Sequence, residues 1–325
     1  MQGLKTLHRI LKRVSLMAKA PKTYSIEKKQ ARWGLLFTLP CLIFFIIFAF
    51  YPIINALFTS FTNRRAVART SEFIGFDNYV YLFTKENGGF SLANSFRATL
   101  TFTFGTFIPM IIVSLIIAVF LMQLRKPRHR GFFQLMYYTP AVLSSVVAAA
   151  IWMIIFDPRG LMNQISNWFM HTSGVDYKWL VDNTMLQVST MLVYFWKYIG
   201  YFVILFITGL ASIPNTIYEA ATVDGSSRWH SFWHITLPLL KPTTVMVSIM
   251  AMLQCLKTFS TQYMFYQGGA ARQPIDVITM NIYFTGIANG RLGRASAMSI
   301  ILFLIMLTLT YIQLRLTRSS EDVEY

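Results

Sequence analysis

Six long apolar runs constrain the fold of this chain more than any other feature. We expect them at residues 33–61, 95–124, 132–156, 185–211, 243–265 and 295–314. An α-helix needs about 20 apolar residues to cross about 30 Å of hydrocarbon, and each run is long enough. Within a bilayer each spanning segment must satisfy its own backbone hydrogen bonds, and helices do so. The sequence therefore predicts an all-α, polytopic membrane protein with six transmembrane helices.

The composition agrees with a membrane protein and argues against a soluble one. The chain has 55% hydrophobic and 13% charged residues, whereas soluble domains carry about 25% charged residues. Its net charge of +16 would suggest nucleic acid in a soluble protein. Here the basic residues stand beside apolar runs, as is typical of membrane proteins, and we expect no nucleic-acid partner. Cys41 and Cys255 lie within apolar runs, so we expect free thiols.

The distribution of basic residues predicts the topology. Residues 1–32 are rich in Lys and Arg and contain one acid, Glu27. This tail is too long and too polar for a signal peptide, so we expect a cytoplasmic arm on anionic lipid, with nucleic-acid binding as the alternative. Six crossings place both termini on one side, and the positive-inside rule assigns that side to the cytoplasm. The loop at 125–130 and the tail at 317–325 fall on the same side. The outward stretch 62–93 departs from the rule, because it carries Arg64, Arg65 and Arg69.

A polar stretch at 214–238 separates the fourth and fifth runs, on the cytoplasmic side by the same count. Glu219, Ala220 and Ala221 predict a short helix, which Gly225 can end with a positive φ. Pro238 marks the start of the next element. The small alanines would allow another backbone to approach closely, so the stretch is typical of a docking element.

The spacing of this stretch resembles the cytoplasmic coupling motif of ABC-importer permeases. The matching residues are Glu219, Ala220, Ala221, Asp224, Gly225, Ile235, Leu237 and Pro238. Weaker matches to carbohydrate permeases follow the first run, at Phe73–Tyr79 with Leu82 and Phe83, and recur at 140–163 and 257–269. Ala270 stands where that family usually has proline. On these residues the chain is identified as the permease subunit of a maltose-type carbohydrate importer of bacteria.

This resemblance implies a type I permease domain at 33–316 in the bacterial inner membrane, with both termini cytoplasmic. It also implies that Glu219, Ala220, Ala221, Asp224 and Gly225 contact an ATPase. No G-x-x-x-x-G-K-[ST] occurs in the sequence, so we expect no enzyme activity and no cofactor in this chain. ATP and Mg would be bound by partner subunits. The implied partners are a second homologous permease, forming a heterodimer, two cytoplasmic ATPases, an extracytoplasmic solute-binding protein, membrane lipid and a sugar or oligosaccharide moved by alternating access.

Polar and aromatic groups in the spans indicate a candidate substrate pathway. These candidates are Trp152, Tyr194, Trp196, Lys197, Tyr198, Gln254, Lys257 and Tyr263. The aromatic rings could stack on sugar rings, or they could belong to the aromatic belt at the membrane interface. The two lysines would favour an acidic oligosaccharide if they face a cavity. Packing or charge pairing is the alternative for them.

Other functions fit the sequence less well. An ion-coupled secondary transporter, the main alternative, predicts intramembrane carboxylates, and the six runs contain essentially none. A membrane enzyme would need clustered acids or a metal site. His230 and His234 are four residues apart but lack a third ligand nearby, so we expect no metal site. The sequence leaves open a disaccharide, a longer oligosaccharide, glycerol phosphate or an acidic sugar as substrate.

Overall fold

The computed structural model describes residues 23–68, 70–84, 91–124, 126–172 and 175–321, with the backbone alone at 23–28 and 316–321. Most of the predicted N-terminal tail, Arg125 and the last four residues lie outside the described residues. The chain divides into two units, residues 1–56 and 57–325. Almost all of the described chain is helical, and its one β-bridge is the isolated pair Thr62–Phe73.

The first unit is a continuous apolar helix. It comprises α2 (Thr23–Phe45), the π-helical turn η1 (Ile46–Phe50) and α3 (Tyr51–Ser60), whose end belongs to the second unit. Within residues 29–60 an 18-residue window has a mean hydropathy of 2.4, sufficient for a membrane span. Pro52 would clash with the carbonyl four residues earlier in a regular helix. The π turn directly before it widens the helix, with the N–H of Tyr51 bonded to the carbonyl of Ile46.

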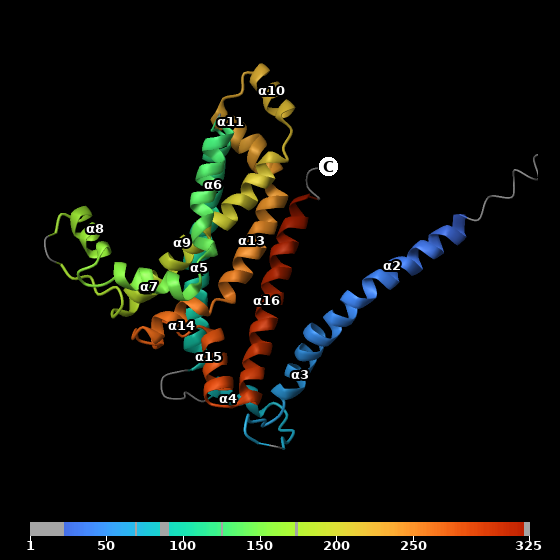
Figure 1. Ribbon diagram of the computed structural model, residues 1–325, viewed down its shortest axis with the longest axis vertical. Coiled ribbons are helices and arrows are strands. Elements are labelled where there is room, and N and C mark those ends of the chain that lie inside the picture. Colours follow the sequence, from blue (N-terminus) through green and yellow to red (C-terminus); the bar gives the residue numbers. More distant parts are fainter. Residues whose placement is uncertain (1–22, 69, 85–90, 125, 173–174, 322–325) are drawn as a thin grey trace, which may run out of the picture. The chain divides into compact units, whose positions relative to one another are not determined.

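The second unit contains the other spans and the connecting helices (Figure 1). Its first half consists of α4 (Asp77–Thr84), α5 (Leu92–Met122), α6 (Pro127–Val142), α7 (Ser145–Ile155), α8 (Leu161–Phe169) and α9 (Asn183–Ala211). The coupling stretch follows as α10 (Asn215–Val223), α11 (Arg228–Ser231), the π turn η2 (Phe232–Thr236) and α12 (Leu237–Leu239). The rest consists of α13 (Lys241–Leu256), α14 (Ser260–Gln267), η3 (Gln273–Ile275), α15 (Ile278–Tyr283), the π turn η4 (Phe284–Ala288) and α16 (Leu292–Glu321).

The predicted third span is broken in the structure. Within the described residues five helical stretches are long and apolar enough to cross a membrane, and the pair α6 and α7, bent by 99° at its junction, makes a sixth only if both helices belong to one span. Leu143 and Ser144 are extended at the break, with ψ of 142° and 151°. Ser144 caps α7 by accepting the N–H of Val147 at 3.2 Å. The sequence predicted one continuous helix at 132–156, because both arms of this bend are apolar.

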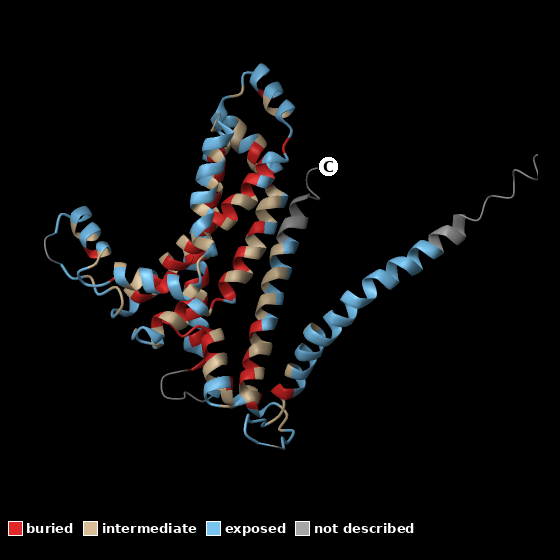
Figure 2. Cartoon of the chain, in the orientation of Figure 1, coloured by how far each residue is buried: buried red, intermediate tan, exposed pale blue. Residues whose placement is uncertain are grey.

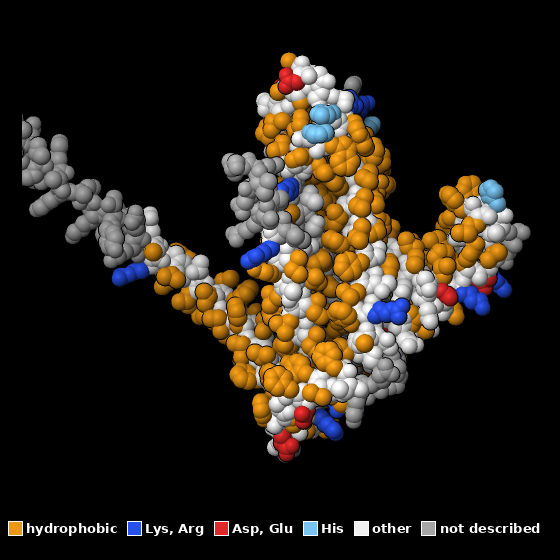
Figure 3. All heavy atoms as spheres, turned by 180° about the vertical axis from the view of Figure 1, so that it is seen from behind, with side chains coloured by type: hydrophobic (Ala, Val, Ile, Leu, Met, Phe, Trp, Pro, Cys, Tyr) orange, Lys and Arg blue, Asp and Glu red, His pale blue; other side chains and the backbone are white. Residues whose placement is uncertain are grey.

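The core of the second unit lies between α5, α9 and α13. Phe202, Val203 and Phe206 of α9 are at most 1% exposed. Gly200 allows α6 to approach closely, because a Cβ there would lie 2.0 Å from the Tyr137 carbonyl oxygen. Figure 2 shows buried residues concentrated on these helices and α10 mostly exposed. Figure 3 shows hydrophobic side chains along the flanks of the long helices, as expected for surfaces that face lipid or a partner helix.

Candidate coupling element and transport pathway

The coupling stretch begins with a short exposed helix at one end of the second unit (Figure 1). Glu219 and Ala220 are exposed on the surface of α10, whereas Ala221 of the same helix is buried. Gly225 follows the helix with φ of +78°, and the space where a Cβ would stand is open. The helix and the glycine stop that the sequence predicted are confirmed. The contact of these residues with an ATPase stays a prediction.

The end of α10 is fixed by a complete cap. The N–H of Ser226 donates to the carbonyl of Ala221 at 2.9 Å, and the N–H of Gly225 donates to the carbonyl of Thr222 at 3.1 Å. These two bonds define a Schellman motif, which satisfies carbonyls left free at a helix end. Asp224 occupies the cap position between them. The motif requires the left-handed conformation at Gly225, which explains why glycine stands there.

Side-chain hydroxyls connect α10 to the helix that leads into the fifth span. The hydroxyls of Tyr218 and Thr236 lie 3.0 Å apart. Those of Ser226 and Ser231 also lie 3.0 Å apart. Thr236 is 7% exposed and ends η2, directly before α12 and α13. These hydrogen-bond partners could not be predicted from the sequence, because isolated hydroxyl residues are common in loops. The arrangement can pass a displacement of α10 to α13.

A cavity of about 460 Å³ lies behind α10, between the coupling stretch and the ends of α5 and α9. Its polar lining includes Gln123, Asn215, Thr222 and Arg228. His230 and His234 follow Arg228 in the chain. Their exposed rings stack on each other, with the ring centroids 4.0 Å apart. No group of three metal-ligating side chains occurs among the described residues.

Three of the candidate pathway residues meet between α9 and α13. Tyr194 is 5% exposed, and its hydroxyl donates to the backbone carbonyl of Gln254 at 2.9 Å. The ring of Tyr198 lies 4.6 Å from the ring of Tyr194. Phe102 of α5 contacts Tyr194 edge to face. This cluster joins three spans, and the Tyr194 hydroxyl is engaged within the protein.

Three further candidates lie where α9 contacts α7, Trp196 and Lys197 on α9 and Trp152 on α7. Lys197 is 4% exposed and donates from Nζ to Ser145 Oγ at 2.9 Å, at the break that precedes α7. The rings of Trp152 and Trp196 meet edge to face at 5.6 Å. Trp152 Nε1 is buried without a hydrogen-bond partner within the described part of the chain. A buried donor of this kind can donate a hydrogen bond to the oxygen of an incoming hydroxyl group.

The two remaining candidates lie apart from these groups. Lys257 is exposed at the end of α13, where the chain breaks before α14. Tyr263 packs in an aromatic group with Phe259 and Tyr283, and its ring centroid lies 5.1 Å from the centroid of each of the two rings. The eight candidates therefore form separate groups rather than one lining. Contact of any of them with substrate stays a prediction.

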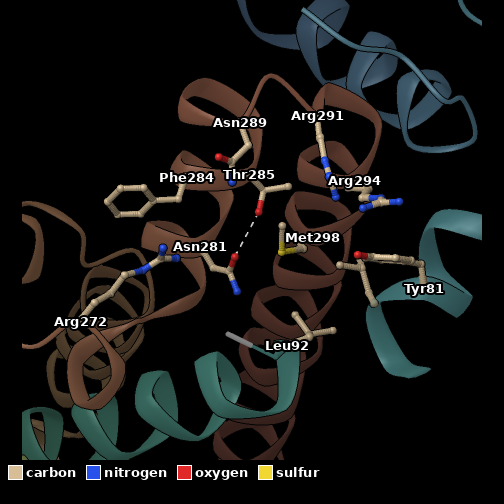
Figure 4. A pocket seen from close by; sticks show the side chains of 11 residues that line it. Tyr81, Leu92, Arg272, Asn281, Phe284, Thr285, Asn289, Arg291, Arg294 and Met298 are labelled. Atoms are coloured by element: carbon tan, nitrogen blue, oxygen red, sulfur yellow. Dashed lines mark hydrogen bonds between the residues drawn. The ribbon is translucent and has the colours of Figure 1, made fainter. Parts of the chain in front are cut away.

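A buried polar network lies at the end of the second unit opposite α10, and the sequence did not predict it. Asp276 is 2% exposed and accepts from Arg272 Nε at 2.8 Å and from Ser95 Oγ at 3.2 Å. Asn281 donates to Ser95 Oγ at 2.9 Å, and Thr285 donates to Asn281 at 3.1 Å, the dashed line in Figure 4. Burial raises the pKa of the Asp276 carboxyl, and Arg272 acts against that rise.

Comparison with known proteins gives matches over almost the whole chain. Residues 34–321 match the model of the family described as "Binding-protein-dependent transport system inner membrane component". The chain is 30% identical to the arabinooligosaccharides transport system permease protein AraP of Bacillus subtilis, over 90% of each chain. It is 30% identical to the multiple sugar-binding transport system permease protein MsmF of Streptococcus mutans, over 89% of this chain and 96% of that protein.

The fold is also similar to that of solved structures. A chain of a bacterial ABC transporter involved in the import of the acidic polysaccharide alginate aligns with a TM-score of 0.74 and 24% identity, over 91% of this chain and 99% of that one. A chain of the alginate transporter in complex with an alginate pentasaccharide-bound periplasmic protein aligns with a TM-score of 0.75. These matches establish the fold of the chain.

Proposed function

This chain belongs to the family of binding-protein-dependent transport system inner membrane components, and from that premise we propose that it is the membrane-spanning permease subunit of an ATP-driven importer for a sugar or oligosaccharide. The observation that carries the proposal is the exposed helix α10, which ends in a Schellman cap and is bonded through Tyr218 to the turn before α13. Such an element offers a surface to a motor protein and a rigid connection to a span.

The energy for transport comes from partner subunits in this proposal. ATP and Mg bind two cytoplasmic ATPases, whose closure displaces α10. Glu219 is an exposed acceptor for a cationic or amide donor on the ATPase. The displacement passes through the hydroxyl pair Tyr218–Thr236 to α12 and α13, and the two permease subunits then alternate between inward-facing and outward-facing states.

The proposed assembly contains a second, homologous permease and an extracytoplasmic solute-binding protein in addition to the ATPases. The family's description as binding-protein-dependent supports the binding protein as a partner. The proposed location is the bacterial inner membrane, with both termini in the cytoplasm. Under this topology α10 lies in the cytoplasm, where the ATPases are.

The proposed substrate class follows the relatives whose names specify one. They include permeases for arabinooligosaccharides, for multiple sugars and for trehalose and maltose, and also one for sn-glycerol-3-phosphate. The proposal extends to acidic sugars because Lys197 is buried in a span with a hydroxyl as its hydrogen-bond partner. Within the described residues no carboxylate lies within 4.0 Å of Lys197 or Lys257.

Reconstitution of the complete transporter tests the proposal. Mass spectrometry of the native solute-binding protein would identify the sugar it retains, and ATP-dependent uptake of that sugar into proteoliposomes is the expected result. Uptake that follows an ion gradient without ATP would contradict the proposal.

Two substitutions test the role of α10 in the same assay. We expect Glu219→Lys and Gly225→Asp to leave the complex assembled while uptake per ATP hydrolysed falls by about tenfold or more, since the first reverses the exposed charge and the second strains the cap. Gly131→Asp is the matched control, because Gly131 has open space for a Cβ but no positive φ. Normal coupled uptake by both α10 variants would count against the assignment.

A further inference from the structure

Two of the outward arginines that depart from the positive-inside rule, Arg64 and Arg65, converge with other arginines in the structure, and Arg69 lies outside the described residues. Arg64 and Arg65 line a pocket of about 90 Å³ together with Arg291 and Arg294, which stand at the start of α16. Backbone bonds hold the two segments together. The N–H of Gly293 donates to the Arg64 carbonyl at 3.0 Å, and the N–H of Ala66 donates to the Gly290 carbonyl at 2.8 Å. The cluster is therefore built by the fold rather than by chance proximity of long side chains.

A second pocket adjoins the first and shares Arg291 and Arg294 with it. It has a volume of about 140 Å³ and is also lined by Arg272, Asn281 and Thr285. Figure 4 shows Arg272 on one side of this pocket and Arg291 and Arg294 on the other, with the amide of Asn281 between them. The walls thus present guanidinium and amide groups to a common space.

No ion pair joins the four arginines of this cluster to a carboxylate within the described part of the chain. The one ion pair recorded there joins Arg272 to Asp276, and Arg64, Arg65, Arg291 and Arg294 have no carboxylate within 4.0 Å. Arg294 stacks on the ring of Tyr81 at 3.5 Å, and its Nη1 atom is buried without a hydrogen-bond partner. Gathering like charges is unfavourable unless an anion joins them. A buried donor without a partner also indicates a missing acceptor.

We infer that Arg64, Arg65, Arg291 and Arg294 form a socket that receives a carboxylate side chain of the extracytoplasmic solute-binding protein. The inference rests on the proposed function, which places this end of the unit outside the membrane and assigns such a partner to it. The socket would hold the binding protein in one orientation over the transport pathway, since a guanidinium fork bonds a carboxylate in a fixed geometry.

The pocket dimensions favour a carboxylate side chain over an anionic lipid. Volumes of about 90 and 140 Å³ admit a small terminal group but not an oligosaccharide. The free Nη1 atom of Arg294 is buried, so an anion must enter the pocket to reach it. A carboxylate is the terminal group of its side chain, so it can enter the pocket with the rest of the side chain behind it. A lipid phosphodiester carries substituents on two sides, which the narrow pocket opposes.

The test measures the affinity of the purified solute-binding protein for the complete transporter in phosphatidylcholine nanodiscs. We expect Arg291→Gln/Arg294→Gln to weaken this affinity by about 10- to 100-fold, the range for losing charge-assisted bonds at an interface. Arg64→Gln/Arg65→Gln should weaken it in the same direction, and its exposed side chains put folding at little risk. Both changes should reduce the dependence of affinity on salt. Arg159→Gln, an exposed arginine of another outward loop, is the control and should stay within about twofold of wild type.

Three outcomes would overturn the inference. Unchanged affinity in both double variants, with wild-type basal ATP hydrolysis as the check of assembly, would exclude the socket. A loss as large in the Arg159 control would mean that only overall charge matters. An effect that arises only when phosphatidylglycerol is added to the nanodiscs would assign the cluster to lipid. If the wild-type transporter binds no solute-binding protein, the proposed function fails first and this inference with it.

Discussion

The hydrogen bonds that organise the α10 end of the second unit join residues near in sequence, whereas the opposite end also contains bonds between residues far apart. The cap of α10 links Ser226 to Ala221, and the longest of the coupling bonds joins Tyr218 to Thr236, 18 positions apart. At the other end Ser95 bonds to Asp276 across 181 positions and to Asn281 across 186.

The two ends also differ in exposure. Glu219, Ala220 and Asp224 are exposed, whereas Ser95 and Asp276 are at most 2% exposed. Segments with few buried contacts open locally at low free energy, whereas buried long-range networks open only with the whole unit. We therefore expect changes at the α10 end to alter coupling and changes at the opposite end to alter stability.

The largest expected effect is that of Asp276→Ala. The substitution removes a buried carboxylate that accepts from Arg272 Nε and Ser95 Oγ, and removing one partner of a buried ion pair costs about 3–5 kcal/mol. The thermal unfolding midpoint of the purified protein in detergent should fall clearly. Asp157→Ala, which removes an exposed carboxylate that accepts only at a loop turn, is the matched control and should leave the midpoint almost unchanged. Equal midpoints for the two variants would break the comparison.

A smaller effect, confined to the other end, is expected of Gly225→Ala. A Cβ meets no atoms there, so the cost is that of the left-handed conformation, about 1–2 kcal/mol for a residue other than glycine. It should fray the end of α10, lower uptake per ATP and leave the unfolding midpoint unchanged. Gly131→Ala controls for the added methyl group at a helical glycine with open space. A lowered midpoint in Gly225→Ala would mean that α10 unfolds together with the core.

This difference between the ends also explains what the sequence could and could not predict. The helix at Glu219–Ala221 and its stop at Gly225 depend on residues within one short stretch, so propensity and spacing predict them. The membrane spans were predicted from length and apolar character alone. The resemblance to importer permeases rested on the same local stretch, and the family match agrees with it.

Features that depend on distant residues escaped the prediction. The pairing of Ser95 with Asp276 arises only when α5 and the segment before α15 meet. The bend at Ser144 could not be located in the sequence, because the helices on both sides of it are apolar. Among the pathway candidates, the sequence could not separate Tyr194, which meets α13, from Tyr263, which packs against Tyr283. An apolar run gives the length of a span but not which faces meet.

Two serines have the same capping role at the two ends of the unit. Replacing either one by alanine should cost about 1 kcal/mol, the usual cost of losing a serine cap. Ser91 accepts the N–H of Asn94 at 3.1 Å and starts α5 at the buried end, and Ser227 accepts the N–H of His230 at 3.2 Å and starts α11 at the exposed end. We expect Ser91→Ala to lower the unfolding midpoint and Ser227→Ala to lower uptake per ATP. The same readout changing in both variants would remove the distinction between the ends.

The smallest effect concerns the hydroxyl pair between α10 and η2. Tyr218→Phe removes one hydroxyl from a half-buried hydrogen bond, at a cost of about 0.5 kcal/mol, the low end of the range for such bonds. Uptake per ATP should fall although the unfolding midpoint stays constant. Thr236→Val removes the other partner, and the double variant completes a cycle that isolates the pair. If the bond carries the displacement of α10, the double variant is no worse than either single one, because the connection is already lost. Additive losses would mean that each hydroxyl acts through other contacts, and the path from α10 to α13 would then have to run through the backbone of α11 and η2.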